Sequence, residues 1–555
     1  MKQQITQLVT GSVQRAIQAK TLVEQRLPKI EIEVPKNEIH GDFSSNIAMV
    51  MASAQKTAPR KIAEQIVNHL EDRENLIKKT EIAGPGFINF FINIASWQKV
   101  LRTIHGAGDD YGRNDMGQGE KFQIEFVSSN PTGPLHVGHG RGAAVGDSVG
   151  NILQFCGFDV QKEYYINDAG RQIETLGRSV YLRYQALLGK QIDFPIDCYQ
   201  GSYIQDIASI IQEKHAQDLD DLLEDTAIAY CARVAAGLII KGIRQDLAAF
   251  GVKFDRWFSE QSLYDSGSVD QVIAELQERN IVYEKDGATW FRTSEYQDEK
   301  DRVVVRRNGQ KTYFASDVAY HLDKYRRGFE KVIDVWGADH HGYIPRMTAS
   351  IEALGYRRDQ FEVILVQLVN LLRGGEPVAM STRAGEFITL KDVVDEVGTD
   401  AARFLFLTRH YESPLEFDLE LAKKKTNENP VYYVQYVHAR ISSIIRKGRE
   451  RGIIDQESYA NIVLDSLVEP EEIQLIKALD QFPEVIQKSA NFREPHRVTY
   501  YLMNLASGFH SYYNKHRVLA DDPALVQARL SLVTAVRRII RIGLTLLGVS
   551  APEKM

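Results

Sequence analysis

Cysteine is scarce in this sequence of 555 residues, which contains only Cys156, Cys198 and Cys231. Three cysteines so far apart form neither a disulfide framework nor a C-x-x-C metal site, and this scarcity is typical of the reducing cytoplasm. An unbroken apolar run of about 18 residues is also missing, and the polar first residues lack the apolar core of a signal peptide. We therefore expect a cytoplasmic protein with no membrane span and no protein-bound zinc.

A strong net charge is missing as well. The 67 basic and 74 acidic residues leave a net charge of -7, which excludes a histone-like polycation. It does not exclude a nucleic-acid partner, because a local basic face binds phosphates even on an acidic protein. Residues 431–555 hold 16 Lys/Arg and 13 Asp/Glu, about +3, whereas the other 430 residues carry about -10. Phosphate contact is therefore favoured in the C-terminal region.

The sequence patterns divide the chain into three regions, since 555 residues exceed one ordinary core. Residues 1–115 mix helical spacing with strand-like runs and predict an α+β domain. Residues 116–424 alternate strands and helices, which indicates a parallel sheet, with a helix-rich insertion around 200–300. Residues 425–555 show helical patterns alone and predict an all-α bundle. The C-terminal helices are expected around 431–448, 471–489, 496–518 and 523–547.

The strongest local signal follows a predicted strand at 121–128. A polar loop leads into a helix that we expect to start near Pro134, because proline suits the first helical turn. The free N–H groups and the positive dipole at such a helix end bind anions such as phosphate. His136 and His139 lie three positions apart on one helix face, where imidazoles can donate hydrogen bonds to a phosphate as charge develops.

A stripe of glycines continues along the same helix, at Gly138, Gly142, Gly146 and Gly150. Each glycine costs a helix about 1 kcal/mol relative to alanine, so the stripe indicates a surface that a sheet or a ligand approaches closely. Gly138 would leave room for a base or ribose. The alternatives are a surface helix with two incidental histidines, or a zinc site, which the missing H-E-x-x-H glutamate disfavours.

A second signal lies in VILVQLVNLLRGGEPVAMSTRAGEFITL, where a buried strand leads into a glycine-rich hairpin. Met380 can anchor the following loop, while Ser381, Thr382 and Arg383 supply hydroxyls and a fixed cation for phosphates. Alone, such a loop is more often a solvated turn. Because it follows the first signal on another strand of the same sheet, phosphate binding is favoured.

Together these segments resemble a known family. H-V-G-H resembles the HIGH signature of class I aminoacyl-tRNA synthetases, and A-M-S-T-R resembles their KMSKS loop. EYYINDAGRQI, FASDVAYHLDKY, WGADHHGYI, NPVYYVQYVHAR and the ending LLGVSAPEKM narrow the resemblance to the arginyl-tRNA synthetases of bacterial type, over essentially the whole chain. The resemblance implies a Rossmann-like catalytic domain between a domain that binds the tRNA elbow and a helical domain that binds the anticodon.

The implied activity is the ATP-dependent attachment of L-arginine to tRNA(Arg). Arginine attacks the α-phosphate of Mg-ATP, which gives arginyl-adenylate and pyrophosphate, and the activated carboxyl then esterifies the terminal adenosine and releases AMP. Such chemistry needs positioning and charge stabilisation and no protein nucleophile. The implied cofactors are ATP and Mg²⁺, the partners are tRNA(Arg) and arginine, and the protein is expected to be a monomer.

The resemblance also implies residue roles. The expected catalytic residues are His136, His139, Ser381 and Arg383. The expected ATP-binding residues are Thr132, Gly133, Pro134, His136, Gly138, His139, Met380 and Ser381. The expected arginine-binding residues are Glu125, Ser128, Asn130, Tyr313, Asp317 and His341. The expected tRNA-binding residues are Phe87, Asn89, Tyr433, Tyr436, Tyr513 and Met555.

Two of these assignments have structural alternatives. Asp317 can instead be a helix N-terminal carboxylate, and the tyrosines, together with Tyr512, can be core residues of the bundle. The sequence also departs from the KMSKS pattern, because Ala379 and Thr382 replace its lysines and Gly133 stands where some relatives carry a compensating lysine. We expect Arg383, with Mg²⁺, to act on the pyrophosphate instead.

Three other functions share parts of this pattern. They are a class I synthetase for another amino acid, a nucleotidyltransferase with the same H-x-G-H site, and a catalytically silent tRNA-binding paralogue. The long helical C-terminal region disfavours the second, and the retained histidines and Asp317 disfavour the third.

Overall fold

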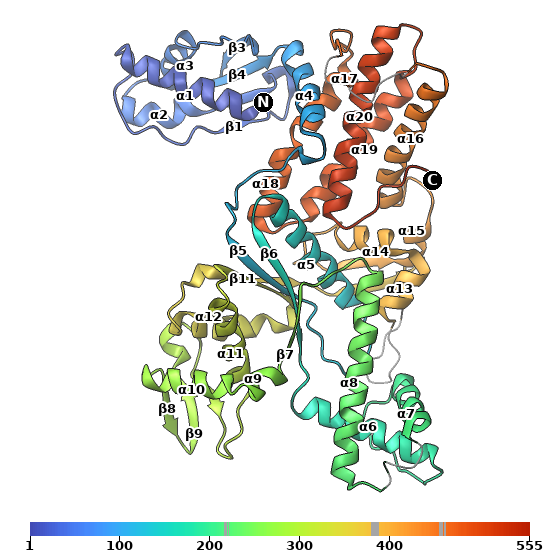
Figure 1. The fold of residues 1–555 in the computed structure, drawn as a ribbon. Coiled ribbons are helices and arrows are strands. Elements are labelled where there is room, and N and C mark those ends of the chain that lie inside the picture. The colour runs from blue at the N-terminus through green and yellow to red at the C-terminus, as the bar shows by residue number, and fades with distance from the viewer. Residues whose placement is uncertain (216–218, 220, 379–387, 454–458, 460–461) are drawn as a thin grey trace.

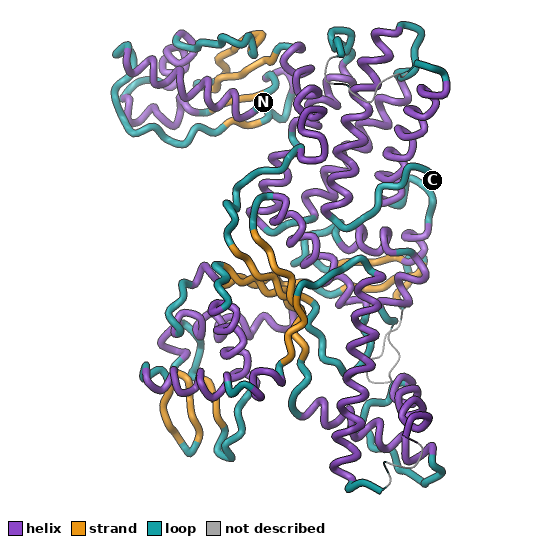
Figure 2. The backbone as a smooth tube through the Cα atoms, in the orientation of Figure 1, coloured by secondary structure: helices purple, strands orange, loops and turns teal. Residues whose placement is uncertain are grey.

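The computed structural model describes residues 1–215, 219, 221–378, 388–453, 459 and 462–555. An N-terminal α+β domain lies beside a C-terminal helical bundle, and a parallel sheet below them forms the centre of the molecule (Figure 1). Two further lobes extend below this sheet, one purely helical in its described part and one with its own strands (Figure 2). The fold class expected from the sequence is therefore confirmed.

The N-terminal domain is a four-stranded antiparallel sheet in the order β1-β2-β4-β3, covered by helices. Its elements are α1 (Lys2–Gln18), β1 (Ile32–Glu33), β2 (Phe43–Ser45), α2 (Ile47–Gln55), α3 (Pro59–Asn68), β3 (Ile77–Ala83), β4 (Phe87–Ile92) and α4 (Ile94–Ala107). Ile5, Val9, Val13 and Ala16 recur every three or four residues in α1, and all four are fully buried. This spacing explains why the sequence predicts α1, whereas the short strand β2 carries no comparable pattern.

The central sheet has five parallel strands in the order β12-β11-β5-β6-β7. Its strands are β5 (Lys121–Phe126), β6 (Asp159–Ile166), β7 (Arg256–Ser259), β11 (Lys331–Gly337) and β12 (Phe361–Val366). Helix α5 (Val137–Phe155) connects β5 to β6. The chain adds β6 and β7 on one side of β5, and later adds β11 and β12 on the other. The strand order therefore switches between β5 and β11, which is where open α/β sheets bind their ligands.

The expected single insertion is in fact two insertions, separated by β7. The first is helical in its described part and contains α6 (Arg171–Leu187), α7 (Ser202–His215) and α8 (Glu224–Ala249). The second contains α9 (Gln261–Asp265), α10 (Ser268–Glu278), β8 (Val282–Lys285), β9 (Ala288–Phe291), β10 (Arg302–Val305) and α11 (Tyr313–Arg326). The sequence did not reveal this division because β7 has only four residues and begins with an exposed arginine.

Helix α8 is the one described helix long and apolar enough, by length and composition alone, to cross a membrane. Arg233 and Lys241 interrupt its apolar residues, and the helix packs along α6 in the lower right lobe of Figure 1. Core helices of globular proteins meet the same two criteria, and Ala235, Ile239 and Ile243 of α8 are buried in this way.

The remaining elements lead from the sheet into the helical bundle. They are α12 (Ile344–Ala353), β13 (Val369–Arg373), β14 (Glu376–Pro377), α13 (Leu390–Val397), α14 (Thr399–Phe406), β15 (Leu415–Asp418) and α15 (Leu419–Lys423). The bundle consists of α16 (Pro430–Glu450), α17 (Pro470–Asp480), α18 (Phe482–Phe492), α19 (His496–Lys515) and α20 (Pro523–Leu546). The helix expected at 471–489 is two helices, because Pro483 lacks an N–H and lies in the first turn of α18.

One buried arginine joins three parts of the molecule. Arg403 of α14 is fully buried and forms an ion pair with Asp147 of α5. Its Nε donates to the carbonyl of Leu547, after α20, at 3.0 Å, and its Nη1 donates to the carbonyl of Phe250, after α8, at 3.1 Å. Lys162 of β6 is the second cation on Asp147, at 2.6 Å.

We predict that Arg403→Met lowers the free energy of unfolding by about 3–5 kcal/mol, because it leaves a buried carboxylate with one cation fewer and two carbonyls without donors. Chemical denaturation followed by circular dichroism measures the change. Arg403→Lys retains the charge but not the three-way fork, so it should lose less stability. A loss below about 1 kcal/mol for Arg403→Met would show that this junction is not a main stabilising contact.

Candidate functional site

The helix that carries the two histidines begins later than the sequence predicts. Its first residue is Val137 rather than Pro134, and His136 is its N-cap. The Nδ1 atom of His136 accepts a hydrogen bond from the N–H of Gly138 at 3.1 Å, and Nδ1 of His139 accepts from the N–H of His136 at 3.2 Å. The expected start at Pro134 is therefore wrong, because the histidine pair caps the helix itself.

This capping fixes the proton on each ring. Because both Nδ1 atoms accept from backbone N–H groups, the neutral rings carry their proton on Nε2. The two rings stack with their centroids 3.7 Å apart. Desolvation lowers the pKa of His136, and desolvation together with the neighbouring ring lowers the pKa of His139 to about 3. The site therefore presents two neutral Nε2–H donors at pH 7.

The glycine stripe serves both the sheet and the cavity. A Cβ atom on Gly146 would stand 2.4 Å from the Phe126 ring on β5, and one on Gly150 would stand 2.6 Å from the Lys162 side chain on β6. A Cβ atom on Gly142 would meet nothing within 4 Å, whereas one on Gly138 would stand 2.9 Å from the capping His136 ring, and both glycines line the cavity. Gly146 and Gly150 therefore let α5 approach the sheet, Gly138 accommodates the His136 cap, and Gly142 leaves room for a ligand.

A cavity of about 1300 Å³ opens at the carboxyl ends of β5, β6 and β11, next to the start of α5. Most of the predicted ATP and arginine residues line it together: Glu125, Ser128, Asn130, Thr132, Gly133, Pro134, His136, Gly138, His139, Tyr313 and Asp317. The first insertion contributes to the wall through Tyr203, whose hydroxyl donates to the carbonyl of Thr132 at 2.6 Å.

Among the described residues, one predicted arginine-binding residue does not join this group. His341 is exposed and is not among the residues that line the cavity, whereas its neighbour His340 is. Met380, Ser381 and Arg383, together with Ala379 and Thr382, lie outside the described residues.

The loop after β5 is strained. Val127 and Ser128 have φ angles of 70° and 40°, a left-handed conformation that costs a β-branched residue in particular. Ser128 accepts a hydrogen bond from the N–H of Tyr165 through its Oγ at 3.1 Å, and Asn130 donates to Gln172 at 2.7 Å. These contacts hold the loop against β6 and the start of α6.

Another part of the cavity lining is rich in acceptors. Asp317 of α11 accepts a hydrogen bond from the Tyr343 hydroxyl, and no described cation lies within ion-pair distance of it. Glu260 is almost fully buried, accepts from Ser316 at 2.8 Å, and has no described partner for Oε2. Burial raises the pKa of Asp317 and raises that of Glu260 to about 7. These carboxylates lack a cation that a ligand could supply.

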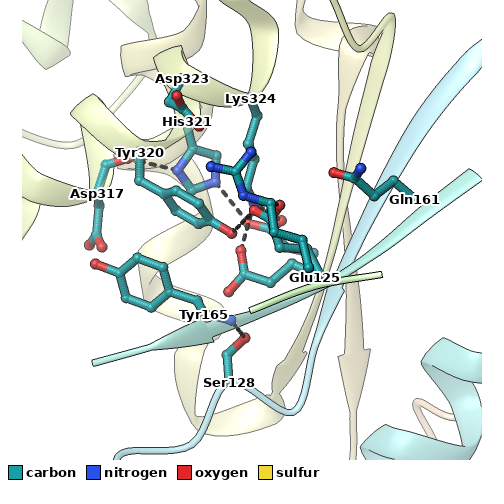
Figure 3. A network of polar contacts seen from close by, with 12 residues as sticks. Glu125, Ser128, Gln161, Tyr165, Asp317, Tyr320, His321, Asp323 and Lys324 are labelled. Atoms are coloured by element: carbon teal, nitrogen blue, oxygen red, sulfur yellow. Dashed lines mark hydrogen bonds and ion pairs between the residues drawn. The ribbon is translucent and has the colours of Figure 1, made fainter. Parts of the chain in front are cut away.

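Sequence reasoning missed Glu260 and Tyr165, whose buried hydroxyl also has no described hydrogen-bond partner. Tyr165 and Asp317 point toward the same space in Figure 3. An acidic residue directly after a parallel strand indicates a ligand site, and Glu260 follows β7 in this way. The sequence does not predict β7, so this signal could not be used.

The predicted tRNA-binding residues lie on the two upper domains. On the bundle, the Arg440 guanidinium lies 5.0 Å from the Tyr436 ring and 5.3 Å from the Tyr513 ring, and the Tyr433 ring lies tilted against His510 with the centroids 4.6 Å apart. Met555 is exposed, whereas Tyr512 is fully buried, so the core alternative is confirmed for Tyr512.

In the N-terminal domain the two candidates differ. Phe87 is 39% exposed at the start of β4, but Asn89 is buried and accepts from Ser44 at 2.7 Å.

A capped histidine pair at the switch point of a parallel sheet, beside a cavity of about 1300 Å³, agrees with the class I aminoacyl-tRNA synthetase that the sequence leads us to expect. Residues 104–413 match the family described as tRNA synthetases class I (R), catalytic domain. Residues 3–92 match the arginyl tRNA synthetase N terminal domain, and residues 434–555 match the DALR anticodon binding domain.

Individual relatives agree with these matches. Over the full length of both chains, the sequence is 58% identical to an arginine--tRNA ligase of Desulfosudis oleivorans and 55% identical to one of Syntrophotalea carbinolica. A putative arginyl-tRNA synthetase structure from Campylobacter jejuni is 36% identical with a TM-score of 0.75, and covers 83% of this chain and 99% of its own. The Thermus thermophilus arginyl-tRNA synthetase shares the fold over 100% of both chains, at 21% identity and a TM-score of 0.76. The chain belongs to the arginyl-tRNA synthetase family.

Proposed function

We propose that the cavity at the carboxyl ends of β5 and β11 holds arginine and ATP side by side. The chain attaches L-arginine to tRNA through an arginyl-adenylate, as its family does. One observation carries the proposal: the lining of one cavity holds both neutral imidazole donors and carboxylates that have no described cation. The imidazoles suit a phosphate and the carboxylates suit a guanidinium.

Within the proposed phosphate site, His136 and His139 donate from Nε2 to the α-phosphate as it becomes pentacoordinate. Gly142 leaves the backbone accessible to the ribose, and Gly138, Thr132, Gly133 and Pro134 border the nucleotide. ATP brings Mg²⁺ with it as part of the substrate. Met380, Ser381 and Arg383 remain predicted contacts of the nucleotide and the pyrophosphate, with Arg383 in the role of the missing lysine.

Within the proposed guanidinium site, Asp317 and Glu260 accept from the five-donor fork, and Tyr313 borders it. Glu125 receives the α-ammonium group, and Ser128 and Asn130 border the carboxylate that reacts. His340 lines the cavity and is therefore a better candidate for substrate contact than His341.

The substrate tRNA extends from this cavity over both upper domains. We assign Tyr433, Tyr436, Tyr513 and Met555 to the anticodon region, since aromatic faces bind splayed RNA bases. Phe87 is assigned to the elbow, and Asn89, buried on the same strand, accepts a hydrogen bond from Ser44 and so supports β4. A monomeric state, tRNA(Arg) as the particular acceptor and a cytoplasmic location complete the proposal.

We predict that Tyr436→Ala raises KM for tRNA(Arg) about tenfold, because a base stacked on an aromatic side chain contributes about 1–3 kcal/mol. Steady-state arginylation at varied tRNA concentration measures the effect, and KM for arginine should stay unchanged. Tyr500 of α19 is exposed but lies outside the Arg440 cluster, so Tyr500→Ala is the matched control. Equal KM values for both variants would remove Tyr436 from the RNA surface.

Charging assays with arginine, citrulline and lysine test the proposed pocket. Citrulline has nearly the shape of arginine but no charge, and lysine has the charge without the planar fork. We expect charging with arginine alone, and efficient charging with citrulline would contradict a pocket of ionised carboxylates.

A further inference from the structure

Three buried carboxylates stand in a row across the central sheet. Asp334 of β11 is the register partner of Glu125 on β5, and Glu125 is the register partner of Glu163 on β6. Neighbouring strands lie about 4.8 Å apart, so these side chains on one face are close to each other. Asp334 and Glu163 are fully buried and Glu125 is 7% exposed. Parallel sheets are normally apolar inside, and such a row needs compensating cations.

Most of the compensating cations come from α11 and from Arg327 directly after it, with Arg256 of β7 at 3.7 Å from Glu163, and they are distributed unevenly along the row. Glu163 accepts from both terminal nitrogens of Arg327, at 2.6 and 2.8 Å, and from the Tyr320 hydroxyl at 2.7 Å. Asp334 contacts His321 and Lys324, each at 2.8 Å. Among the described residues, Glu125 has one hydrogen-bond donor, the Lys324 ammonium at 2.6 Å on Oε2. Figure 3 shows this network around Glu125.

Glu125 is also the member of the row with exposed surface on the cavity, so its other oxygen is left for a ligand. Burial raises the pKa of Glu125 above its usual value; the charge of Lys324 opposes this rise, and that of Asp334 adds to it. Lys324 itself is fully buried, and its ammonium lies 4.3 Å from the centre of the Tyr320 ring. Because water does not reach this ammonium, its charge is stabilised by the carboxylates and the ring around it.

We propose that Lys324 is a positioning residue for the substrate: its single ammonium, shared by Glu125 and Asp334, keeps Glu125 ionised and leaves Oε1 free to receive the α-ammonium of arginine. This inference rests on the proposed role of Glu125. Without Lys324, Glu125 faces Asp334 across the strand pair with no cation of its own. The energetically easier state is then a protonated Glu125, which has lost its attraction for the α-ammonium.

The test uses δ-guanidinovalerate, which is arginine without its α-amino group, as a competitive inhibitor of arginylation. The ratio of its inhibition constant to KM for arginine measures how strongly the protein recognises the α-ammonium. We expect Lys324→Met to lower this ratio at least about fivefold, which corresponds to about 1 kcal/mol, and to leave KM for ATP unchanged. Raising the pH should restore the ratio in Lys324→Met, because Glu125 then ionises, whereas the wild-type ratio stays constant.

Two further variants separate the possible failures. Glu125→Gln must lower the ratio as well; if it does not, the proposed role of Glu125 is wrong. If Glu125→Gln lowers the ratio and folded Lys324→Met does not, the role of Lys324 is overturned while that of Glu125 stands. In Asp334→Asn, Glu125 is the one carboxylate left on the Lys324 ammonium, so this variant must keep the wild-type ratio. This result can be checked even if Lys324→Met does not fold. A strongly lowered ratio in Asp334→Asn would contradict the proposal that the shared Lys324 ammonium alone keeps Glu125 ionised.

Discussion

Replacement of His139 by asparagine lowers kcat for arginylation about 100- to 1000-fold, the loss seen when one preorganised donor to a transition-state oxyanion is removed. The His139 imidazole is already neutral and desolvated, and its Nδ1 contact holds the ring in place. Its Nε2–H therefore does not have to reorient as the phosphate gains charge. KM for arginine should change little, because the imidazole acts at the phosphate and not at the amino-acid pocket. Steady-state arginylation with saturating ATP and tRNA measures both constants.

His136 needs a different control, because it also caps α5. His136→Asn keeps a good N-cap side chain but cannot reach the phosphate, so we expect a similar fall in kcat with unchanged thermal stability. His136→Ala should lose about 1 kcal/mol of stability in addition. A kcat within about tenfold of wild type in both asparagine variants would show that the histidine pair only builds the helix end.

Asp317→Asn lowers kcat/KM for arginine at least about 100-fold, corresponding to roughly 3 kcal/mol for a buried charge pair broken on one side. The side chain keeps its shape and its contact with Tyr343, but the guanidinium loses the negative charge opposite it. KM for ATP should change much less, since Asp317 comes from α11 and has no described contact with the histidine pair at the start of α5. Varied arginine at fixed ATP and tRNA gives the constants.

Tyr343→Phe is the matched control for this variant. It removes the hydroxyl that donates to Asp317 and leaves the carboxylate and its charge in place. We expect an effect of only a few fold, about 1 kcal/mol for one hydrogen bond. Equal losses in Asp317→Asn and Tyr343→Phe would mean that geometry rather than charge decides recognition, against the proposed ion pair.

Long, periodic elements could be predicted from the sequence. The four buried residues of α1 and the strand–loop–helix around His136 have patterns strong enough to decide their structure, and both elements are present. Short elements such as β7 could not be predicted, since four residues carry too little pattern. The start of α5 was misplaced because proline at a first turn is a weaker determinant than a side-chain cap.

The site likewise contains residues that could be predicted from the sequence and residues that could not. His136, His139, Glu125 and Asp317 belong to long motifs, so the resemblance identified them, and the cavity brings all four together. Glu260 and the row of Asp334, Glu125 and Glu163 depend on strand register and on contacts between distant segments. No local pattern encodes which strand becomes the neighbour of which, so these acceptors became visible only in three dimensions.

The central claim is that the cavity activates arginine. ATP–pyrophosphate exchange, measured with each of the twenty amino acids in the presence and absence of tRNA(Arg), tests it most directly. We predict exchange with arginine alone, and only when tRNA(Arg) is present, as the family resemblance implies. Exchange with a different amino acid, or no exchange under any of these conditions, would contradict the account.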